Sequence, residues 1–252
     1  MAMLNMRYVF PDRIIDLNRV PELDFVKEEA DGILIGAMTR QRTLLRSPLI
    51  KSRLPVVPKA LRHVGHFQTR NRGTIGGSLC QLDPSAELPA VAMAYDATVV
   101  ATGPKGQRSL PFSEFPVAYM TPALEADEVL TAVRLKPWRG KVGTGFSEFS
   151  RRHGDFAVAG AIALLEGGEQ GTISRASLTL FGVSEAPKRA HDVEEAVVGQ
   201  QLSSGLIAEV TRLCIAYATL EDTFGSADYR GHVAAAMAEA ALSEAATELE
   251  LP

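Results

Sequence analysis

One short stretch of the sequence places small residues and hydroxyl groups where they could bind an anion. It holds three glycines, a threonine and a serine just ahead of an apolar segment: Gly73, Thr74, Gly76, Gly77 and Ser78. Because glycine has no Cβ atom, several backbone N–H groups of such a turn can approach a phosphate, and the hydroxyl groups can add donors. Such a turn could hold a phosphate or diphosphate, but the residue types alone favour a structural role for it, because glycine-rich turns are common. The simpler alternative is a tight connection that needs glycine only for its backbone angles.

Two carboxylates follow this turn at positions where they could serve either a ligand or the fold. Asp83 precedes Pro84, an arrangement typical of a helix that has Asp as its N-cap and Pro as its first residue. A role as helix cap and a role in ligand binding are therefore both open for Asp83. For Glu87 the alternatives are a ligand contact and a solvated carboxylate.

The histidines and cysteines do not form a pattern typical of a metal centre. His63 and His66 are three residues apart and could share a helix face, but no third ligand lies near them in the sequence. A catalytic metal site usually needs three protein ligands, so we predict no metal site. The two cysteines, Cys80 and Cys214, are too few for an iron–sulfur cluster, which needs about four thiolates.

Composition and charge narrow the class of protein. The chain has 252 residues, of which 46% are hydrophobic and 22% charged, the balance of a globular protein. Lys and Arg number 26 and Asp and Glu 30, so the net charge is 26 − 30 = −4, which gives no support to nucleic-acid binding. No apolar run is long enough to span a bilayer, and the first residues lack the blocks of a signal peptide. We expect a cytoplasmic protein.

The elements that must position the turn are short strands and helices. Asp31-Gly32 and residues 103–106 are typical of hairpin turns. Thr39 is expected to cap a helix, and prolines between residues 48 and 58 to divide the next segment into short helical pieces. In this first part of the chain, strands are expected at residues 13–17, 25–27, 33–37, 97–102, 107–110 and 129–135.

A second part begins after a polar segment, residues 136–141, that is typical of a linker. Strands are expected at residues 156–165 and 176–181, followed by three helices. The last helix is expected at about 227–249, and the middle one carries an apolar stripe of Leu206, Val210, Leu213, Cys214 and Tyr217. Strands and helices segregated in this way predict an α+β fold in two parts.

The segment from Arg70 to Pro89 resembles the flavin-binding turn of the FAD-binding medium subunits of molybdenum hydroxylases. This family includes xanthine dehydrogenases and aerobic carbon monoxide dehydrogenases. Similarity covers essentially the whole chain, including residues 15–23, 35–39, 146–157 and 229–230. The resemblance implies an α+β fold with an FAD-binding domain of the PCMH type at residues 1–138. It also implies a C-terminal domain, a small antiparallel sheet plus helices, at residues 143–250.

The resemblance further implies which residues contact the cofactor. The glycine turn is expected at the FAD diphosphate, the acidic residues at the ribose or adenine side, and a leucine against the flavin, although an ordinary core leucine is the alternative for that residue. The chain itself is expected to hold no catalytic residue and no metal ligand, because FAD supplies the chemistry. The implied FAD-binding residues are Thr74, Ile75, Gly76, Gly77, Ser78, Asp83, Glu87 and Leu124.

A multi-subunit oxidoreductase is the assembly that the resemblance implies. A large subunit would carry the molybdenum cofactor and a small subunit the [2Fe–2S] clusters, in a dimer of heterotrimers. Electrons would reach FAD here and leave to an external acceptor. One alternative is an enzyme of another flavin group, such as an alcohol oxidase or a peptidoglycan-precursor reductase. The other alternative is a degenerate subunit that serves as an assembly module without flavin.

The sequence departs from the family at its start. Family members usually carry roughly fifty further residues there, in line with one strand–helix–strand unit, and these include a first glycine turn of the Ala-Gly-Gly-x-Ser type. Met3 to Arg7 resembles the sequence just after that turn. We therefore expect the native chain to be longer than the sequence given.

Overall fold

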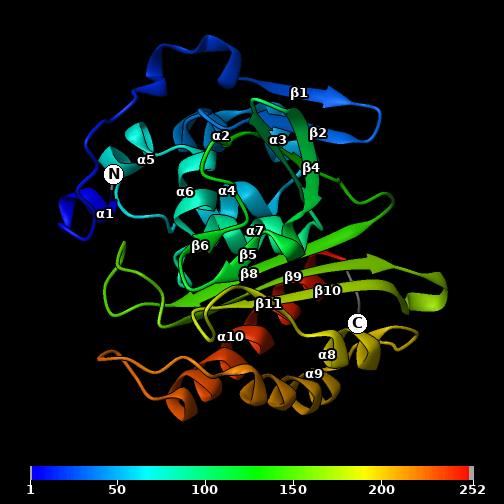
Figure 1. Ribbon diagram of the computed structural model, residues 1–252. Coiled ribbons are helices and arrows are strands. Elements are labelled where there is room, and N and C mark those ends of the chain that lie inside the picture. The colour runs from blue at the N-terminus through cyan, green and yellow to red at the C-terminus, as the bar shows by residue number, and fades with distance from the viewer. Residues whose placement is uncertain (1, 250–252) are drawn as a thin grey trace.

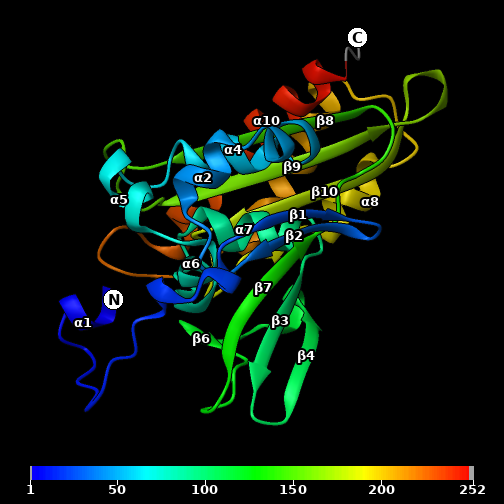
Figure 2. The same ribbon diagram turned by 90° about the horizontal axis from the view of Figure 1, so that it is seen from above.

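A computed structural model describes residues 2–249 of the chain, which form two domains packed face to face (Figures 1 and 2). The first domain is an antiparallel sheet with a group of short helices. The second is another antiparallel sheet, which has the helices of the first domain on one face and its own helices on the other (Figure 1). Among residues 2–249 no helix combines the length and the apolar character that crossing a bilayer requires.

Five strands in the order β1-β2-β7-β3-β4 form the first sheet. Their turns lie at glycines with positive φ, Gly32 at +148° and Gly106 at +111°, so the two predicted hairpin turns are confirmed. A small hairpin joins β5 (Pro116–Ala118) to β6 (Thr121–Pro122). The five strands are β1 (Val26–Glu29), β2 (Gly32–Gly36), β3 (Thr98–Gly103), β4 (Gly106–Pro111) and β7 (Val129–Leu135).

Seven helices belong to this part of the described chain, and most of them are short because proline interrupts the segment. Pro48 is the first residue of one helix and Pro55 precedes the next. The last of them, α7, is buried along its whole length between the two domains. The helices are α1 (Ala2–Asn5), α2 (Gln41–Arg46), α3 (Pro48–Arg53), α4 (Val56–Leu61), α5 (Phe67–Arg72), α6 (Ile75–Gln81) and α7 (Glu87–Ala94).

The second sheet has the strand order β11-β10-β9-β8 and is covered on both faces. Alternation along β9 shows this directly: Ile162 and Leu164 belong to the core of the first domain, whereas Ala161 and Ala163 belong to the core under the C-terminal helices. The elements of this domain are β8 (Val142–Phe149), β9 (Ala159–Gly167), β10 (Ile173–Phe181), β11 (Lys188–Arg189), α8 (His191–Val197), α9 (Ser204–Val210) and α10 (Ala227–Glu248).

Helix α10 lies directly on the edge strand β8. An added Cβ at Gly143 would lie 1.9 Å from the carbonyl oxygen of Ala245, and one at Gly145 would lie 1.8 Å from that of Ala241. The free N–H groups of the strand are also covered. Thr144 N donates to Glu248 Oε2 and Phe146 N donates to Glu244 Oε2, each at 2.9 Å.

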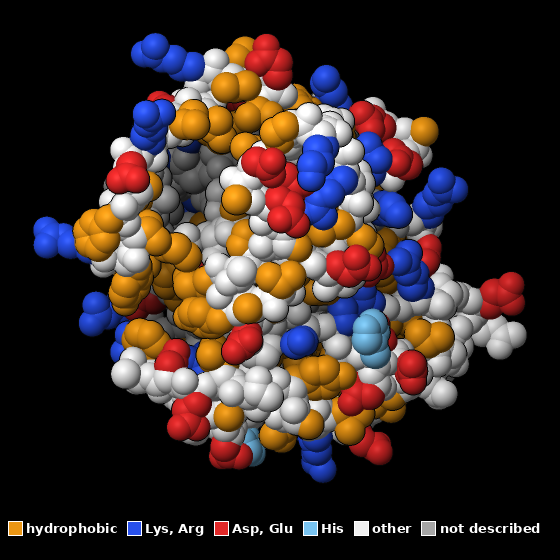
Figure 3. All heavy atoms as spheres, in the orientation of Figure 1, with side chains coloured by type: hydrophobic (Ala, Val, Ile, Leu, Met, Phe, Trp, Pro, Cys, Tyr) orange, Lys and Arg blue, Asp and Glu red, His pale blue; other side chains and the backbone are white. Residues whose placement is uncertain are grey.

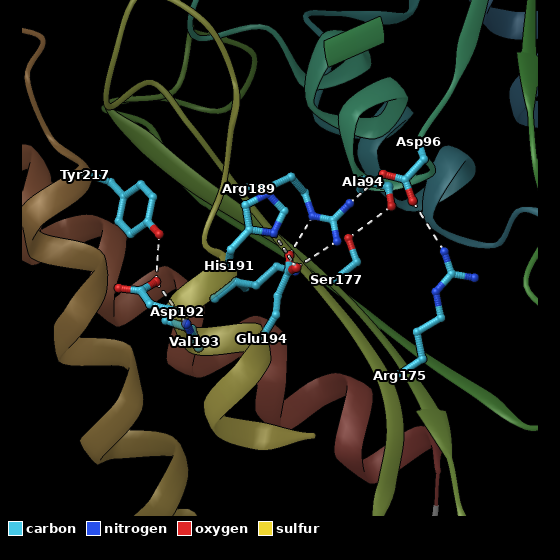
Figure 4. Close-up of polar contacts among 11 residues, drawn as sticks. Ala94, Asp96, Arg175, Ser177, Arg189, His191, Asp192, Val193, Glu194 and Tyr217 are labelled. Carbon is cyan, nitrogen blue, oxygen red and sulfur yellow. Dashed lines mark hydrogen bonds and ion pairs between the residues drawn. The ribbon is translucent and has the colours of Figure 1, made fainter. Parts of the chain in front are cut away.

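Two groups of charged residues join the domains. Lys59 of α4 donates to Glu244 at 2.6 Å, to Glu248 at 2.8 Å and to the Thr144 carbonyl at 2.7 Å. At the other end of the interface, Asp96 accepts from Arg189 at 2.7 Å and from Arg175 at 3.3 Å (Figure 4).

Two further contacts complete this second group. Arg189 also pairs with Glu194, and Ser177 donates to the Ala94 carbonyl at 3.0 Å (Figure 4). The Arg175 guanidinium lies 4.0 Å from the ring centroid of Trp138, which packs against the core of the first domain. Arg175 therefore touches the first domain at two points.

The structure corrects three expectations about local structure and adds one strand to those expected. Residues 13–17 form no strand in the described chain; a 3₁₀ turn begins at Leu17, and Asp16 caps it. Thr39 does not cap α2, because its hydroxyl is buried and bonds to the backbone of Phe25. The predicted middle helix is broken after Val210, where a 3₁₀ segment (Thr211–Tyr217) follows α9. Strand β8 was not expected at all.

Candidate functional site

The glycine-rich turn is the start of helix α6. Thr74 is the N-cap, and its Oγ1 accepts a hydrogen bond from Gly77 N at 3.0 Å. Two other amides of the turn donate to the segment that leaves β2: Ile75 N to Thr39 O at 3.1 Å and Gly76 N to Ala37 O at 2.9 Å. Every amide from residue 75 to residue 78 therefore has an acceptor within the protein.

The amides, the hydroxyl groups and the two glycines of the turn therefore have different roles. Since the amides are engaged, an anion beside the turn would depend on the hydroxyl groups of Thr74 and Ser78, or would have to share the amides. A Cβ at Gly76 would lie 2.6 Å from the Ala37 Cβ and 2.7 Å from the Ala37 oxygen, so this glycine is needed for packing. A Cβ at Gly77 would meet only the Thr74 hydroxyl, at 2.9 Å. The open side of the turn is at Gly77.

The N-terminal segment is tied to the same turn. Arg40 donates to the Arg72 carbonyl and to Asn18 Oδ1, which joins the segment before β1 to the end of α5. Figure 3 shows a deep hollow on this face, at the upper left, under the arch of the N-terminal segment and beside α5 and α6 of Figure 1. The turn therefore borders a concave part of the surface.

The acidic residues expected at the site lie just beyond α6. Asp83 does not cap a helix; its Oδ1 accepts from Ser85 N at 2.9 Å and so stabilises the turn before α7. Glu87 is the first residue of α7 and is 7% exposed, so the alternative of a solvated carboxylate is wrong. Burial raises the pKa of Asp83, and Glu87 has a stronger shift in the same direction.

Burial is the main cause of the raised pKa of Glu87, which is about 8. The second cause is the negative charge of Glu148 on β8, and Asp83 adds a smaller effect of the same sign. The charge of Arg70 opposes them, but weakly. The guanidinium of Arg70 is held elsewhere, because it donates to the carbonyl oxygens of Val64 at 2.7 Å and Gly65 at 3.0 Å.

Leu124 lies on the same side of the domain as the turn. Strand β6 packs against α6, and Leu124 follows it after one intervening residue, partly buried against the core of the first domain. A core role and a flavin contact are both compatible with this position.

Two residues of the site were not among the expected ones. Glu148 has a side chain that is only 3% exposed, and its Oε1 lies 3.1 Å from His63 Nδ1. Its Oε2 is buried without a hydrogen-bond partner among the described residues. His63 packs on Phe146 with ring centroids 4.9 Å apart. In the sequence His63 stands out only through its spacing from His66, and its pairing with a residue 85 positions away depends on the contact between the domains.

The other candidate groups do not converge on a metal. Among residues 2–249, no group of three or more His, Cys, Asp and Glu side chains is arranged to hold a metal ion. Cys80 and Cys214 are both free thiols, and burial raises the pKa of each to about 12, which keeps them protonated and unreactive at neutral pH.

Comparison with known families decides what the site belongs to. Residues 1–138 match the model of the FAD binding domain in molybdopterin dehydrogenase, and residues 144–245 match that of the CO dehydrogenase flavoprotein C-terminal domain. The chain belongs to the flavoprotein subunits of the molybdenum hydroxylases. It is thus a subunit of an oxidoreductase, and its cofactor is FAD. The C-terminal match argues against the other flavin groups considered as alternatives.

Similar proteins support this assignment over nearly the whole chain. The 6-hydroxypseudooxynicotine dehydrogenase complex subunit alpha of Paenarthrobacter nicotinovorans is 37% identical over 96% of this chain and 82% of the relative. The carbon monoxide dehydrogenase medium chain of Hydrogenophaga pseudoflava is 32% identical over 97% of this chain and 85% of the relative.

Solved structures agree with these relatives. A carbon monoxide dehydrogenase structure from Hydrogenophaga pseudoflava superposes with a TM-score of 0.93 at 33% identity, covering 98% of this chain and 86% of that one. The expected family and the α+β fold of two such domains are therefore confirmed.

The residues around the turn suit the cofactor of this family. Gly77 leaves open space beside two hydroxyl groups, and the buried Oε2 of Glu148 is an acceptor that still needs a donor. A cofactor that carries both phosphates and sugar hydroxyl groups would satisfy both kinds of group. The assignment of individual residues, and the limits of the domains, stay predictions; Met1 and Glu250, the outer limits expected, lie outside the described residues.

Proposed function

We propose that this chain passes electrons from [2Fe–2S] clusters of a partner subunit, through FAD, to an external acceptor. Bound FAD would supply the redox chemistry, because it can exchange electrons singly or in pairs. The chain would supply binding, orientation and exclusion of water. Support comes from the family, from the open side of the turn at Gly77, and from the hollow beside α5 and α6 in Figure 3.

The residues that we propose to hold FAD follow from their positions. The hydroxyl groups of Thr74 and Ser78 would bind the diphosphate at the open side of Gly77, and Ile75 and Gly76 would hold the turn against the segment after β2 through their amides. Asp83, Glu87 and Leu124 would contact the rest of the cofactor. The observation that carries this proposal is the difference between the filled space at Gly76 and the open space at Gly77.

We further propose the partners and the domain limits that the family suggests. Names such as medium chain and complex subunit belong to proteins of several subunits, so a large molybdenum-cofactor subunit and a small iron–sulfur subunit would bind here, in a dimer of heterotrimers. The domains would cover residues 1–138 and 143–250. Two free thiols suit a reducing compartment, so we place the protein in the cytoplasm.

Replacing Gly77 with valine tests the site. The added methyl groups would fill the open side of the turn, so FAD retention should fall roughly tenfold or more, a loss of about 1.4 kcal/mol or greater. Flavin absorbance per protein after gel filtration measures this, with circular dichroism to show that helix content is kept. Gly205 of α9 is the matched control, because a Cβ there meets only Ser203 Oγ, at 3.9 Å. Unchanged flavin content in Gly77→Val would disprove the site.

The alternative of an assembly module without flavin is not favoured by the family match. Purifying the complex from its native host distinguishes a flavin-binding subunit from an assembly module. A yellow complex with stoichiometric FAD, molybdenum and iron is expected. A colourless complex that contains the partner subunits but no flavin would support the module.

A further inference from the structure

One buried arginine joins three segments of the second domain. Arg230 lies near the start of α10, and among the described residues it is the largest side chain that is fully buried, at 1% exposed. Its Nη1 donates to Val158 O at 2.5 Å and to Gly182 O at 2.7 Å, and its Nη2 donates to Asp222 Oδ1 at 2.6 Å. A buried cation is costly even when it is paired, so packing alone does not account for an arginine at this position.

The three acceptors of Arg230 come from separate parts of the chain. Val158 ends the connection from β8 to β9, Gly182 follows β10, and Asp222 belongs to the segment before α10. Because the guanidinium is planar and its N–H groups point in fixed directions, it holds these acceptors in one arrangement. Nε has no partner among the described residues, so Nη1 and Nη2 make all three bonds.

Gly182 connects this arginine to the first domain. Its carbonyl oxygen accepts from Arg230, and its N–H donates to Pro84 O at 2.8 Å. Gly182 has a φ of +73°, and an added Cβ would lie 2.7 Å from Val158 O, so glycine is required here. The peptide groups on both sides of Gly182 are thus fixed, and the bond to Pro84 crosses the interface between the domains.

Pro84 lies inside the turn that carries the two carboxylates proposed to contact FAD. Asp83 precedes it, and Asp83 Oδ1 accepts from Ser85 N at 2.9 Å. Glu87, two residues after Ser85, is the first residue of α7. A shift of Pro84 would therefore move both carboxylates, and a displacement of about 1 Å takes a hydrogen bond out of its normal range of distances.

Resting on the proposed function, we propose that Arg230 is a positioning residue of the FAD site. It acts through Gly182: by holding the carbonyl of that residue, the guanidinium sets the N–H that holds Pro84, and so the position of Asp83 and Glu87. Without the guanidinium, Gly182 can turn away from Pro84. The glycine turn itself is held separately, by the bonds of Ile75 and Gly76 to the segment after β2.

A second arginine offers a matched control at the opposite end of α7. The Arg189 side chain is 12% exposed, and it joins the domains through Asp96, which lies just beyond the end of α7 (Figure 4). Pro84 lies before the start of the same helix. Arg189→Met therefore removes an ion pair between the domains without touching the turn that carries Asp83 and Glu87.

Hydrogen exchange, followed by NMR on the flavin-free full chain, tests the link itself. In Arg230→Met the amides of Gly182 and Ser85 should exchange about tenfold faster relative to amides in the middle of β9, because the bonds at the turn are loosened. Arg189→Met should leave both relative rates unchanged. The Asp222 side chain is 37% exposed, so water can hydrate it once Arg230 is gone. Arg230→Lys keeps the charge but not the planar group, and should show a smaller increase.

FAD titrations followed by flavin fluorescence give the effect on the cofactor. The affinity of the folded protein should fall about tenfold or more in Arg230→Met and by less in Arg230→Lys, whereas Arg189→Met should bind FAD as the wild type does. A purely structural role of Arg230 would lower stability in both methionine variants and leave the affinity of the folded protein unchanged. If Arg230→Met does not fold, Arg230→Lys carries the same comparison.

The outcomes separate this inference from the proposed function. Unchanged exchange at Gly182, or wild-type FAD affinity in the folded Arg230 variants, would overturn the role of Arg230. An equal loss of affinity in Arg189→Met would overturn it as well, because the effect would then belong to the interface in general. If the wild-type chain binds no FAD but exchange at Gly182 responds to Arg230, the proposed function fails and Arg230 still positions the turn.

Discussion

Adjacent glycines in the α6 turn are kept for different reasons. Gly76 packs against the backbone of Ala37, whereas Gly77 faces open space. Either residue could have been the one that approaches a phosphate, because the sequence Gly-Gly does not reveal which side of the turn is covered. The distinction depends on where β2 ends, and so on the tertiary structure.

A pair of alanine substitutions would show this difference in stability. In Gly76→Ala the new Cβ would lie 2.7 Å from the Ala37 oxygen, so the free energy of unfolding should fall by about 1–3 kcal/mol. In Gly77→Ala it should change by less, since only a hydroxyl group has to move. Urea denaturation of both variants measures the difference. Equal losses would show that the packing at Ala37 does not decide the role of Gly76.

Glu87 makes stability depend on pH. Its pKa rises from 4.5 to about 8 on folding, so the folded chain binds more protons than the unfolded chain between these values. The free energy of unfolding should therefore be highest near pH 4.5 and fall by on the order of a few kcal/mol as pH rises through 8.

Glu87→Gln, which is always neutral, should be about as stable as wild type near pH 5 and more stable near about pH 9. Denaturation curves at both pH values measure this. A wild-type chain whose stability rises across this range would contradict the assignment, since Glu87 would then be ionised in the folded state at neutral pH.

At the scale of elements, strand β8 depends on helix α10 more than on its own sequence. Residues 142–149 include Gly143 and Gly145, which weaken a strand, and the predicted linker ended just before them. The two glycines are two residues apart, and the Ala241 and Ala245 carbonyls that they meet are one helical turn apart. Two residues along a strand span about 6.7 Å, and four residues along a helix span about 6 Å. These two spacings are close enough for both contacts to form.

Gly145→Ala is the test of this contact. The added Cβ would lie 1.8 Å from the Ala241 oxygen, which cannot move without displacing α10. We expect the free energy of unfolding to fall by about 1–3 kcal/mol or more, measured by urea denaturation. Gly167→Ala on β9 is the control, because its nearest atom is 3.7 Å away. A neutral Gly145→Ala would mean that α10 does not lie on the strand.

The elements that could be predicted from the sequence are those with a local signal. Turn residues and apolar periodicity are local signals. They predicted the hairpins at Gly32 and Gly106, the last helix and most strands. Only part of the candidate site could be predicted from the sequence. The turn and its following carboxylates stand together in sequence, but the partners of Glu87 come from the other domain. Asp83, similarly, matches a helix cap in sequence although it stabilises a turn.

For the whole molecule, the domain interface carries the charges that matter most. Lys59 joins α4 to both carboxylates that cover β8, and it is better buried than they are, at 21% exposed against 42%. Asp96 joins α7 to two arginines but is itself 54% exposed, so water screens its pairs. The two ends of the interface should therefore contribute unequally.

Lys59→Met should lower the free energy of unfolding by about 1–3 kcal/mol at neutral pH, because it leaves two carboxylates one turn apart without a cation. Asp96→Asn should cost about 1 kcal/mol or less. Burial of Glu248 tends to raise its pKa, but its hydrogen bonds from Lys59 and Thr144 lower it below 4.5, so the loss in Lys59→Met should shrink at a pH well below 4.5. Denaturation at both pH values measures it, and a loss that does not change with pH would assign the effect to packing of the lysine stem.

The position of Trp138 offers a built-in reporter of this interface. It is the sole tryptophan of the chain, it packs on one domain, and a guanidinium of the other lies 4.0 Å from its ring centroid. Its emission would therefore change in wavelength and intensity when the domains come apart, without any attached dye. A flavin held in the same chain would also accept excitation energy from it, so one optical signal could follow both domain separation and cofactor loss.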